Sequence, residues 1–286
     1  MRAALLAHVS EFVGSQILHH QPVSGGDISA VYRLDTSLQT LLIKVSDDRS
    51  AKNMFRAEQT GLDAIRKTDT VRVPEIFGLG QFEQTSFLIM EFVDSRKARS
   101  EDYALLGQQL AQLHENSTTL FGWPENNFIG SLPQSNDQTE NWSLFYVEQR
   151  LLPQIELAKV KGLISDFDRH KSERMKSVCK DLLPPVPPAL LHGDLWSGNY
   201  LISADGIPYL IDPSVYFGHS EIDLAMTRLF GGFSDAFYAA YAECKPPQPG
   251  MQERIDLYQL YYLLVHLNLF GISYYGSVEK ILDRYF

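Results

Sequence analysis

The sequence predicts an α+β fold in two lobes, a small lobe built on an antiparallel sheet and a larger one that is mostly helical. Short β-rich runs separated by turns fill most of the first 93 residues, with amphipathic helical stretches among them. Helical periodicity dominates the rest of the chain, and the charged stretch "DSRKARSED" separates the two parts. We therefore predict an N-lobe over residues 1–93, a hinge near residues 93–99 and a C-lobe over residues 94–286.

The predicted N-lobe begins with a helix and continues as two strand pairs around a second helix. One helix is expected across the first 20 residues, and not a signal peptide, because apolar residues recur at steps of three and four: Leu5, Val9, Phe12, Val13 and Ile17. Runs at 31–34 and 41–45 flank the turn "DTSLQT" and predict a hairpin, and a second strand pair surrounds the polar turn 83–86. A helical stripe over 51–67 lies between the pairs, which predicts an antiparallel sheet with this helix packed on it.

The predicted C-lobe is a series of helices interrupted by a long loop and a short hairpin. A helix with leucines on one face begins near Asp102, and residues 119–141, rich in Gly, Pro and Asn, predict an ordered loop. Two helices over about 142–159 and 163–183 end before "PPVPP", and a hairpin is expected over 190–212. Further helices are predicted to begin at Glu221, Ser234 and Gln252, the last running to the C-terminus.

Composition favours a folded protein whose main partner is not nucleic acid. Hydrophobic residues make up 44% and charged residues 21%, as in ordinary globular domains, and the net charge of -10 opposes phosphate backbones. The two cysteines, Cys179 and Cys244, form no CxxC motif, which excludes a disulfide framework or thiolate zinc site and suits a reducing cytoplasm. No apolar run approaches the length of a membrane span. We expect a cytoplasmic protein that binds neither nucleic acid nor membrane.

Three oxygen-bearing side chains mark the C-lobe as the place for chemistry. Asp194 and Asn199 share one turn in "LLHGDLWSGNYLI", and Asp212 follows in "YLIDPSVYFG". Carboxylate and amide oxygens are ligands that Mg²⁺ prefers. Turn capping is the alternative explanation, since Asp and Asn close turns on their own backbone, but it does not account for all three residues together.

The N-lobe holds candidates for the remaining parts of a phosphoryl-transfer site. Gly25 and Gly26 in "SGGDIS" join two β segments and would let backbone N–H groups approach phosphate oxygens. Lys44 stands among apolar strand residues, where burial is costly without a negative partner, and Glu58 on the following helix is the candidate partner. Taken singly, a hairpin turn, an exposed lysine and a solvated glutamate explain these residues equally well. Together with the C-lobe residues they supply the parts that phosphoryl transfer needs.

"HGDLWSGN" followed by "IDP" resembles the catalytic loop and metal-binding motif of protein kinases, with the same five-residue step from Asp to Asn. The His-Gly-Asp form, with Trp196 where protein kinases carry Lys, resembles small-molecule kinases of the aminoglycoside phosphotransferase type. Longer stretches are similar to the fructosamine kinase family, also called ketosamine 3-kinases, across almost the whole chain: "IDPSVYFGHSEIDLAM", "LFGGFSDAFYAAY", "FRAEQTGLDAI" and "TVRVPEIFGLG". The resemblance implies a protein-kinase-like two-lobe fold, with a nucleotide-binding N-lobe and a C-lobe that carries the catalytic loop and the substrate site.

The activity that the resemblance implies is phosphorylation of the 3-hydroxyl of a ketosamine, with ATP and Mg²⁺ as cofactors. Ketosamines form when a sugar glycates an amine, and the phosphate ester breaks down to release the amine, so the family acts in protein deglycation. The implied substrates are ribulosamines, erythrulosamines or fructosamines, as small molecules or bound to protein. We expect the enzyme to be a monomer.

The resemblance also assigns roles to individual residues. It makes Asp194 the catalytic base, places Mg²⁺ on Asn199 and Asp212, and sets Lys44, steadied by Glu58, on the α- and β-phosphates. Further implied roles are phosphate cradling by Gly25 and Gly26, adenine binding by the main chain of Glu91, Phe92 and Val93, support of the catalytic loop by His192 and Asp223, and sugar contacts by Trp196 and His219. Asp27 stands where some relatives carry Cys, so no thiol switch is expected there.

Two other classes of function share part of this pattern. A phosphotransferase for another small hydroxyl compound, such as an aminoglycoside, choline or a sugar, would have the same loop geometry. A non-catalytic ATP-binding module would be expected to lack the base, a metal ligand or the lysine, and none is missing. A protein kinase fits poorly, because only ten residues separate Asp212 from Asp223 and leave no room for an activation loop.

Overall fold

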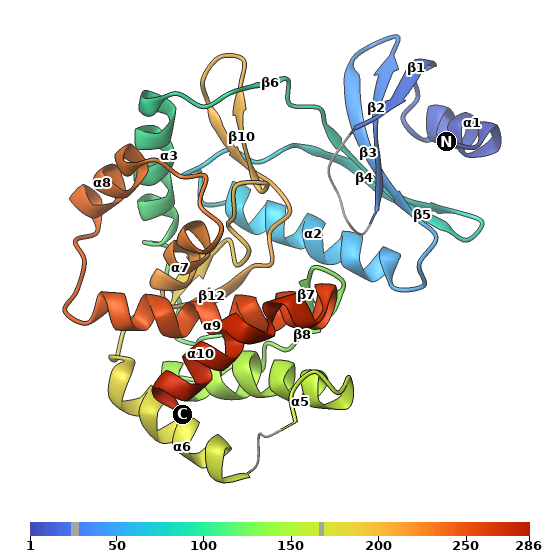
Figure 1. Ribbon diagram of the computed structural model, residues 1–286. Coiled ribbons are helices and arrows are strands. Elements are labelled where there is room, and N and C mark those ends of the chain that lie inside the picture. Colours follow the sequence, from blue (N-terminus) through green and yellow to red (C-terminus); the bar gives the residue numbers. More distant parts are fainter. Residues whose placement is uncertain (24–28, 166–168) are drawn as a thin grey trace.

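The computed structural model describes residues 1–23, 29–165 and 169–286 (Figure 1). The predicted glycine turn with Gly25, Gly26 and Asp27 lies outside the described residues. An antiparallel sheet with two helices forms the N-terminal part, and helices dominate the C-terminal part, which confirms the predicted fold class.

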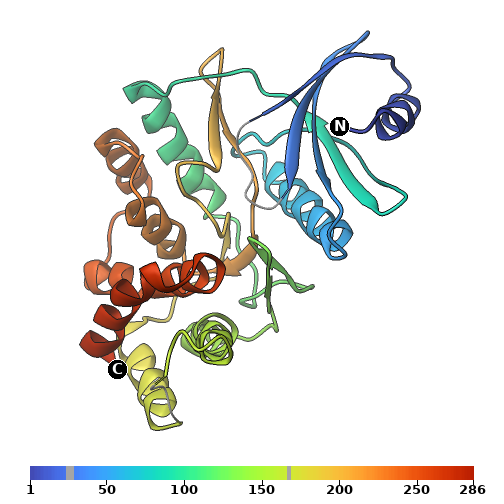
Figure 2. The same cartoon turned by 45° about the vertical axis from the view of Figure 1, so that its right-hand side comes forward.

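The N-lobe sheet has five antiparallel strands in the order β1-β2-β3-β5-β4. A helix covers each face, α1 on one side and α2 on the other (Figures 1 and 2). Side chains alternate across a strand, so Ile43 and Ile89 join the cluster under α1, whereas Leu88 packs with the α2 side. The elements are α1 (Ala3–Phe12), β1 (Ile17–Pro22), β2 (Ala30–Thr36), β3 (Thr40–Ser46), α2 (Ala51–Arg66), β4 (Ile76–Phe82) and β5 (Thr85–Glu91).

The prediction of one helix across the first 20 residues is wrong beyond Phe12. Gly14 has a φ of +63°, a left-handed conformation that ends helices and favours glycine. The chain then turns into β1, where Ile17 pairs with Thr36 of β2. The apolar period of the sequence continues past this glycine because Ile17, the first residue of β1, stands four residues after Val13, a spacing that also occurs on one face of a helix.

The two lobes are joined through a small sheet that contains the hinge. β6 (Ser95–Arg96) pairs with β10 (Tyr200–Ser203), which also pairs with β11 (Pro208–Leu210). The two terminal guanidinium nitrogens of Arg96 donate to the buried carboxylate of Asp102, at 2.6 and 2.9 Å. Asp102 also accepts from the N–H of Arg99 at the start of α3 (Ser100–Leu113). The hinge is thus fixed to the hairpin that follows the catalytic loop. The domain boundary at residue 93 stays a prediction.

The helical lobe is built around α9 (Met251–Phe270), which is buried on most of its circumference. α7 and α5 pack against it, and α3 packs against α8 (Figures 1 and 2). The predicted long loop contains the hairpin β7 (Asn127–Ile129) and β8 (Leu132–Gln134). The other elements are α4 (Trp142–Phe145), a π-helical turn (Tyr146–Leu151), α5 (Leu152–Val160), α6 (Arg169–Leu182), β9 (Ala189–Leu191), β12 (Tyr216–Gly218), α7 (Glu221–Leu229), α8 (Asp235–Cys244) and α10 (Tyr275–Tyr285).

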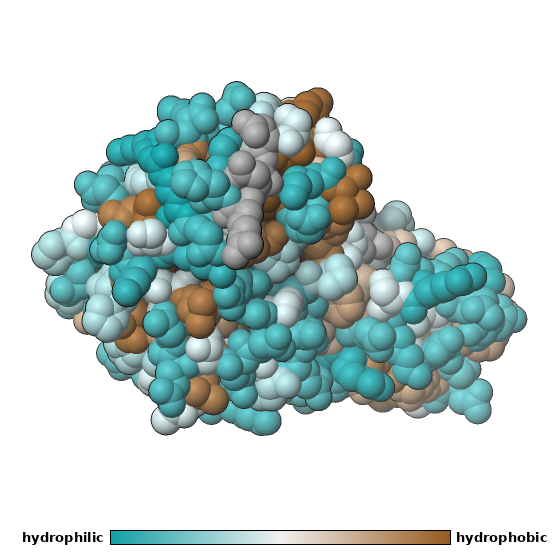
Figure 3. Space-filling view, turned by 90° about the horizontal axis from the view of Figure 1, so that it is seen from below, coloured by the Kyte–Doolittle hydropathy of each residue, from teal (hydrophilic) through white to brown (hydrophobic). Residues whose placement is uncertain are grey.

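The prediction that the last helix runs to the C-terminus is also wrong. Gly271 has a φ of +93° and ends α9, and after the short turn Ile272–Tyr274 the chain returns along α9 as α10 (Figure 1). Among the described residues, none of the helices combines the length and the apolar character that crossing a bilayer requires. The face seen in Figure 3 is mainly hydrophilic, with hydrophobic residues in small groups.

Candidate active site

Lys44 of β3 is a buried cation held between two carboxylates. Its Nζ lies 2.7 Å from Oε1 of Glu58 on α2 and contacts Oδ1 of Asp212 from the C-lobe. Burial alone would lower the pKa of Lys44, but the charges of Asp212 and Glu58 outweigh it and raise that pKa. Lys44 is 8% exposed, and a cation is stable there only with such partners. The structure thus brings together Lys44, Glu58 and Asp212. The sequence analysis assigned Lys44 to the phosphates, Glu58 to the support of Lys44 and Asp212 to the metal.

Asp194 and Asn199 lie at the two ends of the turn between β9 and β10. The amide nitrogen of Asn199 donates to the main-chain oxygen of Asp194 at 2.8 Å and to its Oδ2 at 3.3 Å. Burial, reinforced by the negative charges of Asp212 and Asp223, raises the pKa of Asp194 to about 7. A carboxylate with such a pKa is suited to accept a proton near neutral pH.

Asp212 stands next to Asn199 because β10 and β11 form a hairpin. The N–H of Ile211 donates to the main-chain oxygen of Asn199 at 3.1 Å, which aligns the residue before Asp212 with Asn199. Asp212 has a φ of +55°, a conformation that Asp tolerates better than most residues. Burial raises the pKa of Asp212, but the charge and hydrogen bond of Lys44, together with Glu58 and His192, lower it overall, so the carboxylate stays ionised.

This donor set fits Mg²⁺ when a nucleotide supplies further ligands. The amide nitrogen of Asn199 is used as a donor, which leaves its Oδ1 for a cation, and Asp212 adds carboxylate oxygen on a side chain that is 40% exposed. Within the described residues, no group of three or more His, Cys, Asp or Glu side chains is arranged to hold a metal ion. An ion here would therefore take its remaining ligands from phosphate and water.

Asp223 supports the catalytic loop from α7. Its carboxylate is fully buried and accepts the N–H groups of His192 and Gly193, at 2.8 and 2.9 Å. It also contacts Nε2 of His114 at 3.0 Å, a partner that the sequence analysis missed. The bonds go to the loop and not to the first turn of its own helix, so Asp223 is more than a helix cap. Burial raises the pKa of Asp223, yet these hydrogen bonds and the neighbouring His114 lower it overall.

His192 ties the catalytic loop to the segment that carries Asp212. Its Nε2 lies 2.9 Å from the main-chain oxygen of Ile211, and its Nδ1 accepts from the N–H of Asp194 at 3.2 Å. These two bonds fix the neutral tautomer with the proton on Nε2, and burial lowers the pKa of His192. Because both ring nitrogens serve the backbone, His192 is placed as a support for the loop.

Glu91 ends β5, the strand that pairs with β3, which carries Lys44. The N–H of Glu91 donates to the main-chain oxygen of Glu75 at 2.8 Å, and the guanidinium of Arg33 lies 4.9 Å from the Phe92 ring centre. Among the described residues, no hydrogen-bond partner faces the N–H of Val93. The role of this segment in adenine binding stays a prediction.

The two residues expected on the sugar side have different environments. Trp196 is 38% exposed on the catalytic loop, two residues after Asp194. His219 is 6% exposed, and its Nδ1 lies 2.7 Å from the hydroxyl of Tyr258 on α9. Burial lowers the pKa of His219 to about 3, so the ring is neutral. The contacts of His219 are those of a core residue, whereas Trp196 is accessible to a substrate.

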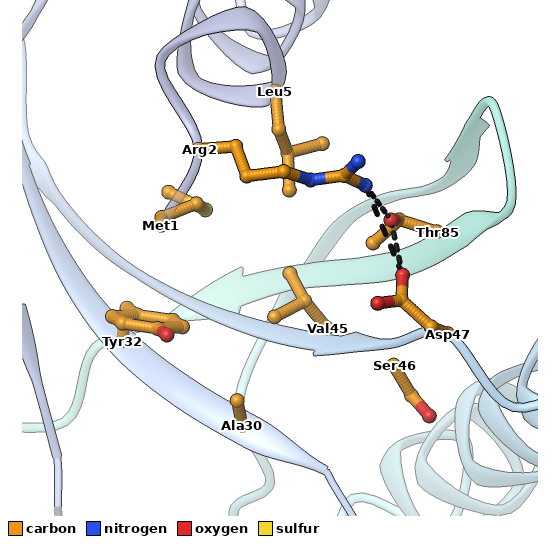
Figure 4. Close-up of a pocket in the computed structure, with 9 residues that line it drawn as sticks. All are labelled: Met1, Arg2, Leu5, Ala30, Tyr32, Val45, Ser46, Asp47 and Thr85. Atoms are coloured by element: carbon orange, nitrogen blue, oxygen red, sulfur yellow. Dashed lines mark hydrogen bonds and ion pairs between the residues drawn. The ribbon is translucent and has the colours of Figure 1, made fainter.

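A separate cavity of about 340 Å³ lies on the other face of the N-lobe sheet, beneath α1 (Figure 4). Within it, Arg2 donates to the hydroxyl of Thr85 at 2.5 Å and lies 3.9 Å from Asp47. Val45 of β3 lines this cavity, and its neighbour Lys44 points to the opposite face of the strand. The cavity therefore lies apart from the site around Asp194.

The fold and the site define a kinase-like phosphotransferase. A solved structure of the aminoglycoside phosphotransferase APH(4)-Ia, in a thermostable mutant without ligand, has a TM-score of 0.62 over 98% of both chains at 16% identity, which shows a shared fold. A putative fructosamine-3-kinase from Haemophilus somnus is more similar, with a TM-score of 0.88 and 29% identity over 98% of this chain and 96% of that one.

Sequence comparison gives the family. The family model described as fructosamine kinase matches residues 1–286. A probable ketoamine kinase (slr1563) from Synechocystis is 38% identical over 270 residues, which cover 94% of this chain and 90% of that protein. The chain belongs to the fructosamine kinase family. The family resemblance noted in the sequence motifs is confirmed.

Proposed function

We propose that this protein transfers the γ-phosphoryl group of ATP to the 3-hydroxyl of a ketosamine and so takes part in protein deglycation. The observation that carries the proposal is the convergence of Lys44, Asp194 and Asp212 in a chain whose full length matches the fructosamine kinase family. Relatives bear the names probable ketoamine kinase and putative fructosamine-3-kinase, which supports the same reaction here.

In the proposed reaction, Asp194 orients the 3-hydroxyl of the ketosamine and accepts its proton. The hydroxyl oxygen forms the new bond to phosphorus as the bond to the β-phosphate oxygen breaks, leaving ADP. Positioning and charge stabilisation supply most of the catalysis in such a transfer. Asn199 holds Asp194 in place through the two hydrogen bonds from its amide nitrogen, at 2.8 and 3.3 Å.

The groups that meet the nucleotide come from both lobes. Lys44, steadied by Glu58, would bind the α- and β-phosphate oxygens, and the main chain around Val93 would bind adenine. Asn199 and Asp212 are the residues that would hold Mg²⁺. When bound, the ion would offset negative charge on the phosphates. Asp212 would then give up its contact with Lys44 and bind Mg²⁺ instead.

A substrate panel tests the proposal. Phosphate transfer from ATP is measured to ribuloselysine, erythruloselysine, fructoselysine, an aminoglycoside and choline, with Asp194→Ala as the inactive control. We expect turnover on a ketosamine, a product phosphorylated at the 3-hydroxyl, and none from the control. Turnover restricted to the aminoglycoside or choline would keep the fold and mechanism and reject deglycation. Binding of ATP without turnover on any acceptor would indicate a non-catalytic module.

We further propose that the enzyme works as a monomer in the cytoplasm. Both cysteines are free thiols, Cys179 buried and Cys244 exposed, which supports a reducing compartment. Sedimentation of the purified chain at micromolar concentration checks the oligomeric state. A species of twice the chain mass would reject the monomer.

A further inference from the structure

A buried layer of amide side chains lies beneath the segment that follows Asp212. Asn127 of β7 donates to the main-chain oxygen of Val215 at 2.8 Å. Gln134 of β8 donates to the main-chain oxygen of Ser214 at 3.3 Å and to Oδ1 of Asn127 at 2.8 Å. The two side chains are only 6% and 2% exposed. The hairpin in the long loop thus holds residues 214 and 215 from below.

These amides bond to two carbonyls, those of Ser214 and Val215, that lie before the first paired residue of β12. The ladder between β12 and β9 begins at Tyr216, so residues 213–215 lie between Asp212 and the first paired residue. Pro213 has no N–H to donate. Buried carbonyls need hydrogen bonds, and side-chain amides supply them here. The position of Asp212 therefore depends on contacts made by a different part of the chain.

The layer is itself fixed in one orientation. The hydroxyl of Tyr261 on α9 donates to Oε1 of Gln134 at 2.6 Å, and Asn136 donates to Oδ1 of Asn127 at 2.9 Å. Arg150, fully buried, donates to Oδ1 of Asn136 at 2.7 Å. Each amide oxygen accepts and each amide nitrogen donates, so flipping any member would break several bonds.

The same helix also holds the catalytic loop. The hydroxyl of Tyr262, next to Tyr261 on α9, donates to the main-chain oxygen of Gly193 at 2.9 Å. The N–H of Ser214 donates to the main-chain oxygen of His192 at 2.8 Å. The segments before Asp194 and after Asp212 are therefore hydrogen-bonded to each other. The first is bonded to α9 directly and the second is bonded to α9 through Gln134.

We propose that Asn127 and Gln134 are positioning residues that set the place of Asp212 through the carbonyls of Val215 and Ser214. This inference rests on the proposed function, in which Asp212 holds Mg²⁺. Apolar side chains of similar volume would stabilise a core equally well, whereas a satisfied polar layer specifies one arrangement. Both amides bond to main-chain oxygens of residues 214 and 215, so we expect their effect on Asp212 to pass through the backbone between residues 212 and 215.

The test compares Asn127→Ala with Asn268→Ala. Asn268 is a matched control, because it is 4% exposed and its amide donates to the main-chain oxygen of Gln154 at 2.9 Å, away from the site. The measurement is the Mg²⁺ concentration that gives half of the Mg²⁺-dependent thermal stabilisation by a non-hydrolysable ATP analogue. We expect Asn127→Ala to raise this Mg²⁺ concentration about tenfold, the smallest loss of metal affinity that is typical when a residue supporting a metal ligand is removed. Asn268→Ala should leave it unchanged.

Three outcomes separate the possibilities. An unchanged Mg²⁺ midpoint in Asn127→Ala, with Tm lowered as in Asn268→Ala, overturns the inference and leaves Asn127 a stabilising residue only. Asp212→Asn serves as reference: if it also keeps the full Mg²⁺ effect, the metal role of Asp212 in the proposed function is wrong. If Asn127→Ala does not fold, Gln134→Met keeps the volume and removes the bonds of the Gln134 amide to Ser214, Asn127 and Tyr261. A raised Mg²⁺ midpoint is expected there too.

Discussion

The ammonium group of Lys44 in the N-lobe sheet contacts the carboxylate of Asp212 in the C-lobe, and Glu58 binds the same cation at 2.7 Å. One buried charge thereby joins the two lobes across the proposed nucleotide site. Each partner has a second function in the proposed reaction, Lys44 on the phosphates and Asp212 on Mg²⁺. The contact between them keeps both charges compensated until those ligands arrive.

Replacing Lys44 by Met should lower both stability and turnover. The variant leaves two carboxylates without their cation, and breaking a buried ion pair costs about 3 kcal/mol of unfolding free energy. We also expect kcat to fall about 100-fold, as when one preorganised charge-stabilising group is removed. Urea unfolding and steady-state kinetics check the two effects. Lys52→Met, on the exposed side of α2, is the control and should change neither.

The pH dependence should report Asp194. Its pKa is raised to about 7 in the folded protein, and the base must be ionised to accept a proton. We expect kcat/KM to be low at pH 5, to rise through about pH 7 and to level off above it. A rate that is constant from pH 5 to 8 on the best ketosamine would argue against Asp194 as the base.

The same carboxyl should also make the protein less stable as the pH rises. The folded-state pKa of about 7 exceeds the ordinary value of 3.8, so between these values the folded state binds the proton more tightly than the unfolded state. The stabilising contribution is complete below pH 3.8 and is lost as the pH rises through 7. Asp194→Asn cannot ionise and should therefore gain stability relative to the natural protein at pH 8, compared with pH 5, in urea unfolding.

Gly193→Ala should be far more damaging than Gly162→Ala. Both glycines have positive φ, +84° and +68°, so both variants incur the cost of a left-handed residue, about 1–2 kcal/mol. At Gly193 a Cβ would also lie 2.1 Å from the main-chain oxygen of Ser214, whereas nothing lies within 4 Å at Gly162. We expect a stability loss at least twice as large at Gly193, together with loss of turnover. Equal losses in thermal unfolding would show that the loop relaxes without cost.

Asp223→Ala should loosen the catalytic loop. It removes the acceptor of two buried N–H groups, at His192 and Gly193, and hydrogen bonds to a charged group contribute about 1.5–3 kcal/mol each. We expect unfolding free energy to fall by about 3 kcal/mol or more and amide hydrogen exchange to rise at residues 192–194. Unchanged protection of these amides would mean that other contacts hold the loop.

Much of the fold follows from local pattern. The predicted strands and helix of the N-lobe after residue 30 match the structure, because turns bound each apolar β-rich run and α2 buries one apolar stripe against the sheet. The errors at both ends of the chain have one cause. Gly14 and Gly271 take positive φ and end helices, but an apolar period can continue through a glycine in the sequence. Whether a given glycine ends a helix depends on the packing beyond it.

The site was partly visible in the sequence. Lys44, Glu58, Asp194 and Asp212 are placed together by the fold, as their order along kinase-like motifs indicated. Asn127 and Gln134 were not identified, because a loop rich in Asn, Pro and Gly looks the same whether its amides face solvent or a buried carbonyl. His219 is the opposite case, a residue assigned to the substrate that the structure buries. Its place beside a motif gave no sign that its ring is packed against α9.

The pairing of β6 with β10 has a consequence for synthesis of the chain. Arg96 pairs with Ile202 and Ser95 with Ser203, so the connection between the lobes stays unpaired until the ribosome has made the catalytic hairpin. Closing so long a loop is slow compared with forming the N-lobe hairpins. The connection to the nascent N-lobe therefore lacks its strand partner while the C-lobe is being made. We expect the orientation of the N-lobe to be set when β10 pairs with β6, the same step that assembles the catalytic loop. Chains that terminate before Tyr200 lack an anchored hinge as well as a complete site.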